Sequence, residues 1–290
     1  MSFDLIVIGG GPAGYLAAER AGHAGLSTLL IEKRFIGGVC LNEGCIPSKA
    51  LLYSAKVCDQ ARHGQKYGVI AGSVLLDHEA VVNRKNKVVN TLVSGVRSKL
   101  KKNRVTLVEG LGLERVGVET ERGRIKTDER GKTNIPEIYA AGDVNGVSML
   151  AHTAYREAEV CISNMLGKKD IMRYNAIPSV IYTNPEVGCV GETEESAKQN
   201  GIEFETAKLS MMYSGRYVAE NEDLDGICKV LIDKRHRRII GVHMIGSYAS
   251  EMIYGAGMMI ETEMRVEDVK KLVFPHPTVS EIIRETIFEL

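Results

Sequence analysis

The chain has 290 residues, and its 37 basic and 37 acidic side chains give a formal net charge of zero at pH 7. This balance argues against the basic surfaces that bind nucleic acid or anionic lipid, so we expect neither a nucleic acid nor a membrane as partner. No apolar run approaches the length of a membrane span, and the chain length predicts two domains. Four of the six cysteines lie scattered in apolar stretches, and we expect them to be reduced core residues of a cytoplasmic protein: Cys58, Cys161, Cys189 and Cys228.

A glycine-rich turn follows an apolar strand predicted at 4–8 and precedes a helix predicted at 12–24. Strand, tight turn and helix in this order are the fingerprint of dinucleotide binding, in which the helix N-terminus faces the pyrophosphate. A second apolar strand, predicted at 27–32, ends about 20 residues beyond the glycines in Glu32, whose carboxylate can accept both hydroxyls of an adenosine ribose. The residues predicted to bind the dinucleotide here are Gly9, Gly11, Pro12, Ala13, Gly14, Glu32 and Lys33.

Two cysteines, Cys40 and Cys45, follow in the segment GGVCLNEGCIPSK. Residues five apart on a straight helix point about 140° away from each other, and a disulfide needs Cα atoms within about 7 Å, so this pair can bridge only across a bent backbone. Gly44 permits the bend, and a helix predicted at 47–63 would favour the Cys45 thiolate at its N-terminus. Small, distorted rings are the readily reduced disulfides, so we expect a redox-active one; the alternatives are two reduced core cysteines or half of a metal site.

A second turn signal lies in the middle of the chain, where Gly142 and Asp143 follow a short apolar segment. Alone, this pair indicates only the end of a strand. The elements predicted around it are a helix at 79–101, strands at 105–109 and 138–141, and a helix at 150–165.

Taken together, these motifs resemble those of the pyridine nucleotide-disulfide oxidoreductases, flavoproteins with two dinucleotide folds. The resemblance implies FAD as cofactor, with the Asp143 carboxylate on its ribitol chain and the segment MLAHTA at the start of a helix that faces the flavin ring. Further FAD contacts implied in this way are Gly38, Val39, Cys40, Cys45, Lys49, Gly142, Met149, Leu150, Ala151, His152 and Thr153.

The C-terminal segment HPTVSE, at 276–281, opens an amphipathic helix. Histidine carries protons near neutral pH, and a carboxylate partner fixes its tautomer. A lone histidine between prolines is ordinarily a turn residue. The family resemblance implies instead that His276 and Glu281 form the acid–base pair, and that the pair reaches the disulfide of the other subunit of a homodimer.

Within the family, the segments CLNEGCIPSK, MLAHTA and HPTVSE most resemble those of dihydrolipoamide dehydrogenases. This resemblance implies that Cys40 exchanges with the dithiol substrate, that Cys45 contacts the flavin, and that Lys49 is a cation near its reactive edge. Dihydrolipoyl groups of an acyltransferase or carrier protein would be the substrate, and NAD the final acceptor. Mercuric reductases share more of the motif but usually add a C-terminal cysteine pair, which this chain lacks.

The second glycine-rich domain, which binds NAD in the family, has no recognisable fingerprint here. The chain runs from the strand predicted at 105–109 directly into a segment that resembles the one after that domain, so a domain of about 100–150 residues is missing. We expect Lys49 to lose its family partner, a glutamate from that region. The predicted organisation is an FAD-binding domain at 1–166, made of segments 1–110 and 111–166, and a dimerisation domain at 167–290.

The predicted fold class is α/β, a Rossmann-like FAD-binding domain followed by an α+β dimerisation domain with an antiparallel sheet. We expect this chain to perform only the thiol and flavin half of the dihydrolipoamide dehydrogenase reaction. The alternatives are a non-catalytic FAD-binding dimer scaffold, or a reductase of another disulfide or of mercuric ion. The last predicted elements are strands at 179–183, 187–190, 204–211, 227–233 and 238–245, and helices at 193–200 and 247–262.

Overall fold

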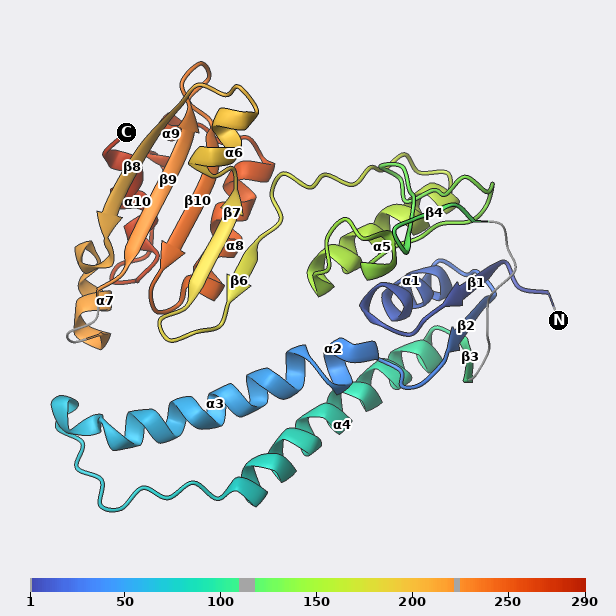
Figure 1. Cartoon of the computed structure of the whole chain (residues 1–290), viewed down its shortest axis with the longest axis horizontal. Helices are drawn as coiled ribbons and strands as arrows, with labels where there is room; N and C mark the ends of the chain where they lie inside the picture. Colours follow the sequence, from blue (N-terminus) through green and yellow to red (C-terminus); the bar gives the residue numbers. More distant parts are fainter. Residues whose placement is uncertain (1, 110–117, 222–224) are drawn as a thin grey trace. The chain divides into compact units, whose positions relative to one another are not determined.

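The computed structural model describes residues 2–109, 118–221 and 225–290. The chain divides into two compact units, Met1–Met172 and Arg173–Leu290, each of which is described by itself (Figure 1). The domain limits predicted from the sequence stay predictions. Within the described ranges, none of the helices combines the length and the apolar character that a membrane span requires.

A three-stranded parallel sheet forms the centre of the first unit. Its strands, with β2 in the middle, are β1 (Leu5–Ile8), β2 (Thr28–Glu32) and β3 (Thr106–Glu109). Helices α1 (Pro12–His23) and α4 (His78–Lys102) pack with the sheet around one core. The buried residues of that core are Tyr15, Ala18, Leu30, Ile36, Leu41 and Leu100. The order strand, helix, strand confirms the predicted Rossmann-like fold.

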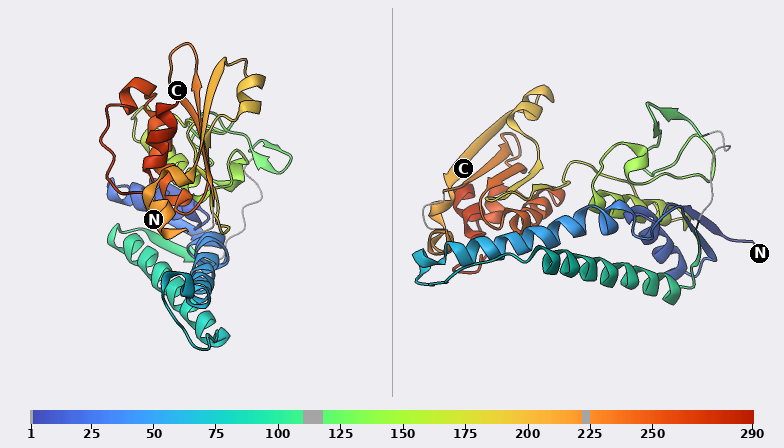
Figure 2. Two further views of the ribbon diagram at one scale, coloured as in Figure 1. Left: turned by 90° about the vertical axis from the view of Figure 1, so that its left-hand side faces the viewer. Right: turned by 60° about the horizontal axis from the view of Figure 1, so that its bottom comes forward.

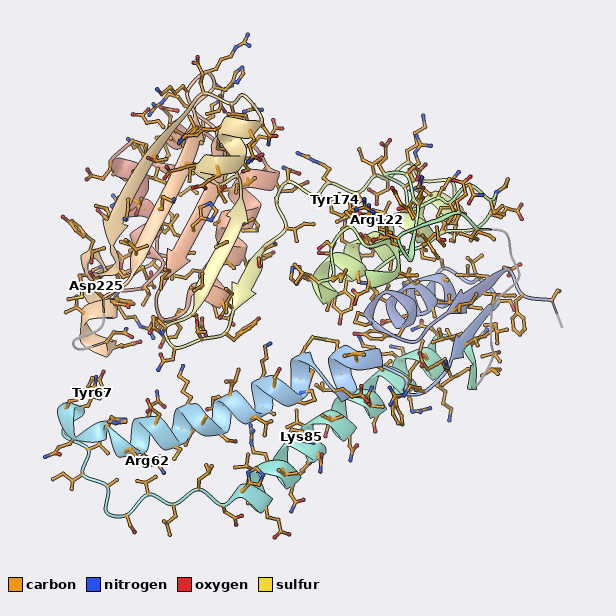
Figure 3. All side chains as sticks on the ribbon, viewed as in Figure 1. Arg62, Tyr67, Lys85, Arg122, Tyr174 and Asp225 are labelled. Carbon is orange, nitrogen blue, oxygen red and sulfur yellow. A yellow bond between two sulfur atoms is a disulfide. The ribbon has the colours of Figure 1, made fainter. Side chains whose placement is uncertain are left out.

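Two long helices, α3 (Cys45–Arg62) and α4, pack as a hairpin (Figures 1 and 2). Figure 3 marks them by Arg62 at the end of α3 and Lys85 on α4. The α4 helix begins because the Asp77 carboxylate accepts a hydrogen bond from the Ala80 N–H at 3.0 Å, and its last turn carries lysines that suit the negative end of the helix dipole. The remaining elements of this unit are α2 (Gly38–Asn42), α3 (Cys45–Arg62), η1 (Gly64–Tyr67), β4 (Thr120–Glu121), β5 (Arg124–Ile125), η2 (Asp143–Asn145) and α5 (Ala151–Met165).

Helix α5 packs against α1. The ring of Tyr155 meets the ring of Tyr15 edge-on, with centroids 6.0 Å apart, and their hydroxyls are hydrogen-bonded. Burial raises the pKa of the Tyr15 hydroxyl, which therefore stays neutral. The contact brings a helix from the second half of the unit to the first glycine-rich motif.

The prediction of a strand at 138–141 is wrong. Among the described residues this segment forms only an isolated bridge, between Lys132 and Tyr139. A strand exists through its pairing with a neighbour, and no described strand lies beside this one, although its apolar sequence suits a sheet. The helix predicted to begin at Pro47 also begins earlier, at Cys45, and helix α2 was not predicted.

The second unit is a five-stranded antiparallel sheet with helices packed on it, as predicted. Its strands, in spatial order, are β6 (Ser179–Ile181), β7 (Val187–Gly191), β10 (Ile239–Ile245), β9 (Ile227–Asp233) and β8 (Phe204–Ser210). Helices α8 and α10 cover one face of it (Figure 2). Helix α8 buries a continuous apolar stripe that includes Met252, Ile253 and Ile260. The helices of this unit are α6 (Glu194–Gln199), η3 (Met211–Tyr213), α7 (Gly215–Glu220), α8 (Ala249–Glu261), α9 (Val266–Val269) and α10 (Glu281–Phe288).

Candidate functional site

A disulfide joins Cys40, in α2, to Cys45, the first residue of α3, with the two Cα atoms 4.7 Å apart. The backbone between them leaves the helical region at Glu43, with φ −130°, and again at Gly44, with φ −124° and ψ −103°. The bridge therefore spans the junction of two helices, which is the bent backbone that the five-residue spacing requires.

Cys45 occupies the first position of an 18-residue helix. The residue before it is Gly44, and within the described part of the chain no side chain caps the N-terminus of α3. The positive end of a helix dipole stabilises a thiolate and lowers the barrier to its release from a disulfide. When the disulfide opens, Cys45 is the sulfur that the local backbone favours as thiolate.

The glycine-rich turn between β1 and α1 leaves room for a phosphate group. Gly9 has a φ of +95°, and a Cβ on Gly14 would lie 1.7 Å from the Gly9 carbonyl oxygen, so both positions require glycine. Gly11 precedes the first residue of α1 without a side-chain cap, and apart from its two chain neighbours no described residue has an atom within 4 Å of where its Cβ would be. Open N–H groups at a helix start, with clear space before them, fit the pyrophosphate of a dinucleotide.

Three segments that are distant in sequence meet at the start of α1. Gly38, which opens the cysteine helix α2, packs so closely that a Cβ there would lie 2.7 Å from the Gly11 Cα. The Gly37 N–H donates to the Gly10 carbonyl oxygen at 2.7 Å. From the other side, a Cβ on Gly142 would lie 3.3 Å from the Ala13 Cβ. The disulfide segment and both predicted FAD motifs therefore surround one helix N-terminus.

A buried carboxylate holds each of the two glycine motifs. Glu32 accepts hydrogen bonds from the N–H groups of Gly10 at 2.5 Å and Arg34 at 2.7 Å. Glu157, on α5, accepts one from the Gly142 N–H at 2.6 Å. The sequence reasoning assigned Glu32 to the ribose and missed Glu157. The sequence does contain a signal for Glu157, because this glutamate lies on the apolar stripe of α5. A glutamate is costly to bury there unless it is hydrogen-bonded.

We expect Glu157→Ala to weaken FAD binding about tenfold and to lower the free energy of unfolding by about 1–3 kcal/mol, because it leaves the buried Gly142 N–H without an acceptor. Glu157→Gln keeps an acceptor oxygen and should retain most of the FAD affinity and most of the free energy of unfolding. The control is Glu159→Ala, on the same helix, whose ion pair with Arg20 is exposed. Titration of apoprotein with FAD and urea unfolding measure the two effects. Wild-type FAD affinity in Glu157→Ala would show that the hydrogen bond from the Gly142 N–H to Glu157 does not contribute to FAD binding.

The other predicted FAD contacts differ in exposure. Asp143 is exposed at the start of η2, and Lys49 is exposed near the start of α3. Met149 is 71% exposed, whereas Thr153 is buried with its hydroxyl 2.9 Å from that of Ser148. Val39, Lys33 and His152 are exposed, and Leu150 and Ala151 are half-buried. The roles assigned to all these residues stay predictions.

In the second unit, His276 and Glu281 form the predicted pair. The His276 Nδ1 lies 2.9 Å from the Glu281 Oε1, and the Glu281 Oε2 accepts a hydrogen bond from the Thr278 N–H at 2.8 Å. The Thr278 N–H and His276 together lower the pKa of the Glu281 carboxyl. An ionised Glu281 can accept a hydrogen bond from the Nδ1–H of His276, and this contact favours the tautomer with the proton on Nδ1. The His276 side chain is 78% exposed and can reach a second molecule.

Glu281→Gln should lower the free energy of unfolding above about pH 5, and the difference from the wild type should vanish as the pH falls well below about 4.3, the ordinary pKa of glutamate. A carboxyl whose pKa is lowered on folding stabilises the protein above its unfolded pKa, and that contribution is lost as pH falls through its folded pKa. Urea unfolding of both proteins between about pH 3 and 8 measures this difference. A difference that stays constant over that range would contradict an ionised Glu281.

The other four cysteines do not share the helix-start position of Cys45. Cys161 and Cys228 are buried, and burial raises the pKa of each thiol to about 12. Cys189 is half-buried, with a pKa also raised by burial, and Cys58 is half-buried. Among the described residues no group of three or more histidine, cysteine, aspartate or glutamate side chains could hold a metal ion.

The sequence matches a known family over most of its length. The profile described as "Pyridine nucleotide-disulphide oxidoreductase" matches residues 3–112 and 108–158, and the profile of the dimerisation domain of the same family matches residues 177–287. The chain belongs to the pyridine nucleotide-disulphide oxidoreductase family. Its members are FAD-dependent enzymes, which confirms the enzyme class predicted from the sequence.

Several relatives of this oxidoreductase carry the predicted enzyme name. Dihydrolipoyl dehydrogenase of Rhizobium etli is 26% identical, with 99% of this chain and 98% of that protein covered. The mitochondrial dihydrolipoyl dehydrogenase of Pisum sativum is also 26% identical, over 97% of this chain and 90% of that protein. The first alignment extends over 471 positions, whereas this chain has 290 residues, so a large internal part of the relative has no counterpart here.

Solved structures share the fold. LpdA from Mycobacterium tuberculosis superposes with a TM-score of 0.89 at 16% identity, covering 98% of this chain and 99% of that one. The flavoprotein disulfide reductase RclA from Escherichia coli, in its Cu(II) complex, superposes with a TM-score of 0.80 at 17% identity, with both chains fully covered.

Proposed function

We propose that this chain performs the thiol and flavin half of the dihydrolipoamide dehydrogenase reaction. The observation that carries the proposal is the close packing of Gly38 on Gly11, which sets the cysteine helix directly against the turn that fits a dinucleotide. The resemblance to proteins named dihydrolipoyl dehydrogenase supports dihydrolipoyl groups as the substrate.

In this proposal the start of α1 binds the FAD pyrophosphate, Glu32 lies by the adenosine ribose, and Asp143 binds the ribitol chain. When bound, FAD would supply an acceptor for the electron pair that the cysteines receive from the substrate. The exposed Asp143 carboxylate and the open N–H groups at Gly11 both fit these roles. Lys49, MLAHTA and the remaining predicted contacts would line the ring.

The cysteines exchange with the substrate in two steps. One thiolate of a dihydrolipoyl group attacks the Cys40 sulfur, and the disulfide bond breaks with Cys45 leaving as the thiolate at its helix start. The second substrate thiolate then attacks the substrate sulfur bonded to Cys40, the bond from that sulfur to Cys40 breaks, and Cys40 leaves as the lipoyl disulfide closes. Two electrons have moved from the substrate to the cysteine pair, and the Nε2 of His276 accepts a substrate proton while Glu281 holds the ring.

The pair His276 and Glu281 would serve the disulfide of a second copy of the chain. The match of 177–287 to a dimerisation domain supports a homodimer in which each active site uses both subunits. The exposure of His276 agrees with a partner outside its own unit. We also propose the predicted division into an FAD-binding domain at 1–166 and a dimerisation domain at 167–290, and a cytoplasmic location.

The nicotinamide half of the reaction would be lost, because the part of the relatives with no counterpart here includes the segment to which we assign NAD binding. The test is reduction of NAD by dihydrolipoamide, with the Rhizobium etli enzyme as positive control. We expect the FAD-loaded chain to be reduced by dihydrolipoamide but to form NADH at least about 10³-fold more slowly than the control. Turnover comparable with that enzyme would contradict the proposal.

A non-catalytic FAD-binding dimer is the second candidate. It is favoured by the same missing segment, since an incomplete unit could hold FAD with the cysteines out of line. Reduction of the bound flavin by dihydrolipoamide would exclude the non-catalytic dimer. A flavin that stays oxidised in the presence of dihydrolipoamide would support it. The substrate class is tested by comparing the rates at which lipoamide, other disulfides and mercuric ion reoxidise the reduced protein.

A further inference from the structure

The parallel sheet of the first unit is apolar on both faces but buried on one. Val7, Leu30 and Leu107 face the core shared with α1 and α4. On the opposite, outer face, Ile6 is 53%, Ile8 is 57% and Val108 is 37% exposed. The strand register places Ile8, Ile31 and Val108 in one row across all three strands, with Ile6 and Leu29 in the next. Thr106 completes the second row, and Ile31 in the middle of the first row is only 7% exposed. The exposed apolar side chains of the outer face therefore lie on the two outer strands, at Ile6, Ile8 and Val108.

Parallel sheets in proteins are covered on both faces, and their strands are apolar throughout for that reason. The consecutive apolar residues LIVI in β1, LLI in β2 and LV in β3 have this character, with Thr28, Glu32, Thr106 and Glu109 only at the ends of β2 and β3. Exposed apolar patches of this kind mark surfaces that bind another polypeptide. The sequence of the sheet therefore fits a covered outer face.

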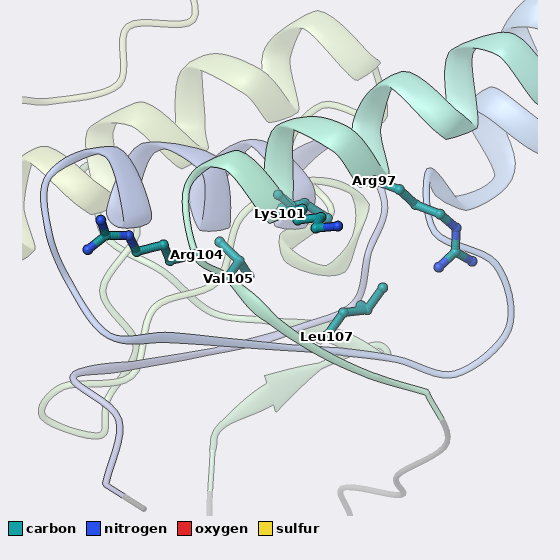
Figure 4. A pocket seen from close by; sticks show the side chains of 6 residues that line it. Arg97, Lys101, Arg104, Val105 and Leu107 are labelled. Atoms are coloured by element: carbon teal, nitrogen blue, oxygen red, sulfur yellow. The ribbon is translucent and has the colours of Figure 1, made fainter.

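The two edges of the sheet differ. Beside β3 lies a pocket of about 400 Å³ whose lining includes the cationic side chains Arg97, Lys101 and Arg104 (Figure 4). Charged side chains of this kind keep a sheet edge solvated. At the other edge, β1 consists of Leu5 to Ile8 with no charge or proline, and among the described residues no strand pairs with it on that side. Such an edge accepts an added strand.

The place where the chain departs from its relatives identifies the occupant. The two matches to the family profile meet at residues 108–112, at the end of β3 and next to the exposed Val108. The alignment with the Rhizobium etli protein extends over 471 positions, so the part of the relative without a counterpart is large enough to form a covering layer. We propose that the outer face and the β1 edge bind a polypeptide corresponding to this internal segment, even when it is supplied as a separate chain. This binding goes beyond the proposed function and requires no electron transfer.

The probe is the internal segment of the Rhizobium etli dihydrolipoyl dehydrogenase, expressed alone and mixed with the full 290-residue chain. Sedimentation velocity should show a complex, and a carboxylate on the docking face should weaken it about tenfold or more because the charge would be desolvated. Ile6→Asp and Val108→Asp place that charge on the outer face. The matched control is Ile70→Asp, because Ile70 is 89% exposed in a loop of the same unit.

Loss of binding in both outer-face variants, with binding intact in Ile70→Asp, would establish the docking face. Because both substituted side chains are already partly exposed, urea unfolding should show near-normal stability and so separate lost binding from misfolding. Equal binding by all three variants, or no complex with the wild type, would overturn the proposal. It would also fail if the chain alone associated through this face, seen as concentration-dependent assembly that Ile6→Asp abolishes.

Discussion

Replacing Cys45 with serine should abolish the reduction of bound FAD by dihydrolipoamide. The substitution removes the disulfide and, with it, the thiolate that α3 stabilises at its first position. Removing one member of a set that reacts as a unit costs about as much as removing all of it, so we expect the reduction rate to fall by about 10³-fold or more. Anaerobic stopped-flow absorbance of the flavin measures that rate.

The matched control is Cys58→Ser, which removes a half-buried thiol from the same helix without touching the disulfide. The FAD bound to Cys58→Ser should be reduced by dihydrolipoamide at the wild-type rate. Cys40→Ser should also stop substrate exchange while leaving the Cys45 thiol in place at the helix start. Wild-type flavin reduction in Cys45→Ser would show that electrons reach FAD by a route that bypasses the cysteine pair.

Gly11→Ala should lower the affinity for FAD without unfolding the protein. The backbone at Gly11, with φ −72° and ψ −173°, is one that alanine adopts, and the added methyl group would meet no described atom within 4 Å beyond its two chain neighbours. The methyl group would occupy only the space assigned to the pyrophosphate. Loss of one or two hydrogen bonds to a charged group corresponds to an affinity about 10- to 100-fold weaker. Quenching of flavin fluorescence on titration of the apoprotein gives the affinity.

The control for this substitution is Gly95→Ala on α4, where a methyl group also meets nothing within 4 Å of the described residues. It should leave FAD affinity unchanged and stabilise the helix by about 1 kcal/mol. Gly14→Ala is the opposite case, because its methyl group would strike the Gly9 carbonyl and distort the turn itself. An unchanged FAD affinity in Gly11→Ala would place the cofactor elsewhere.

Most of the fold follows from local pattern. The apolar strands and the helices predicted at 79–101 and 247–262 rest on short-range patterns, and the structure confirms these elements as β1, β2, α4 and α8. The segment 138–141 is different, because a strand depends on a neighbour and the sequence of a segment does not reveal whether that neighbour is present. Its apolar pattern predicted a strand that the described sheet does not contain.

The candidate site divides in the same way. The cysteine spacing required a bent backbone, and the structure provides it between α2 and α3. His276 and Glu281, five residues apart, are in hydrogen-bonding contact, and their role as an acid–base pair stays a prediction. Glu157 could not be paired with Gly142 from sequence alone, because the contact depends on how α5 packs on α1. The close packing of Gly38 on Gly11 likewise arises from tertiary structure.

The most direct test of the proposed half-reaction is an anaerobic titration of the FAD-loaded chain with dihydrolipoamide, followed by its visible spectrum. If the cysteine pair lies against the flavin, the reduced protein should show the long-wavelength absorption band of a thiolate in contact with oxidised flavin, without any nicotinamide. An oxidised flavin spectrum that stays unchanged throughout the titration would contradict the account.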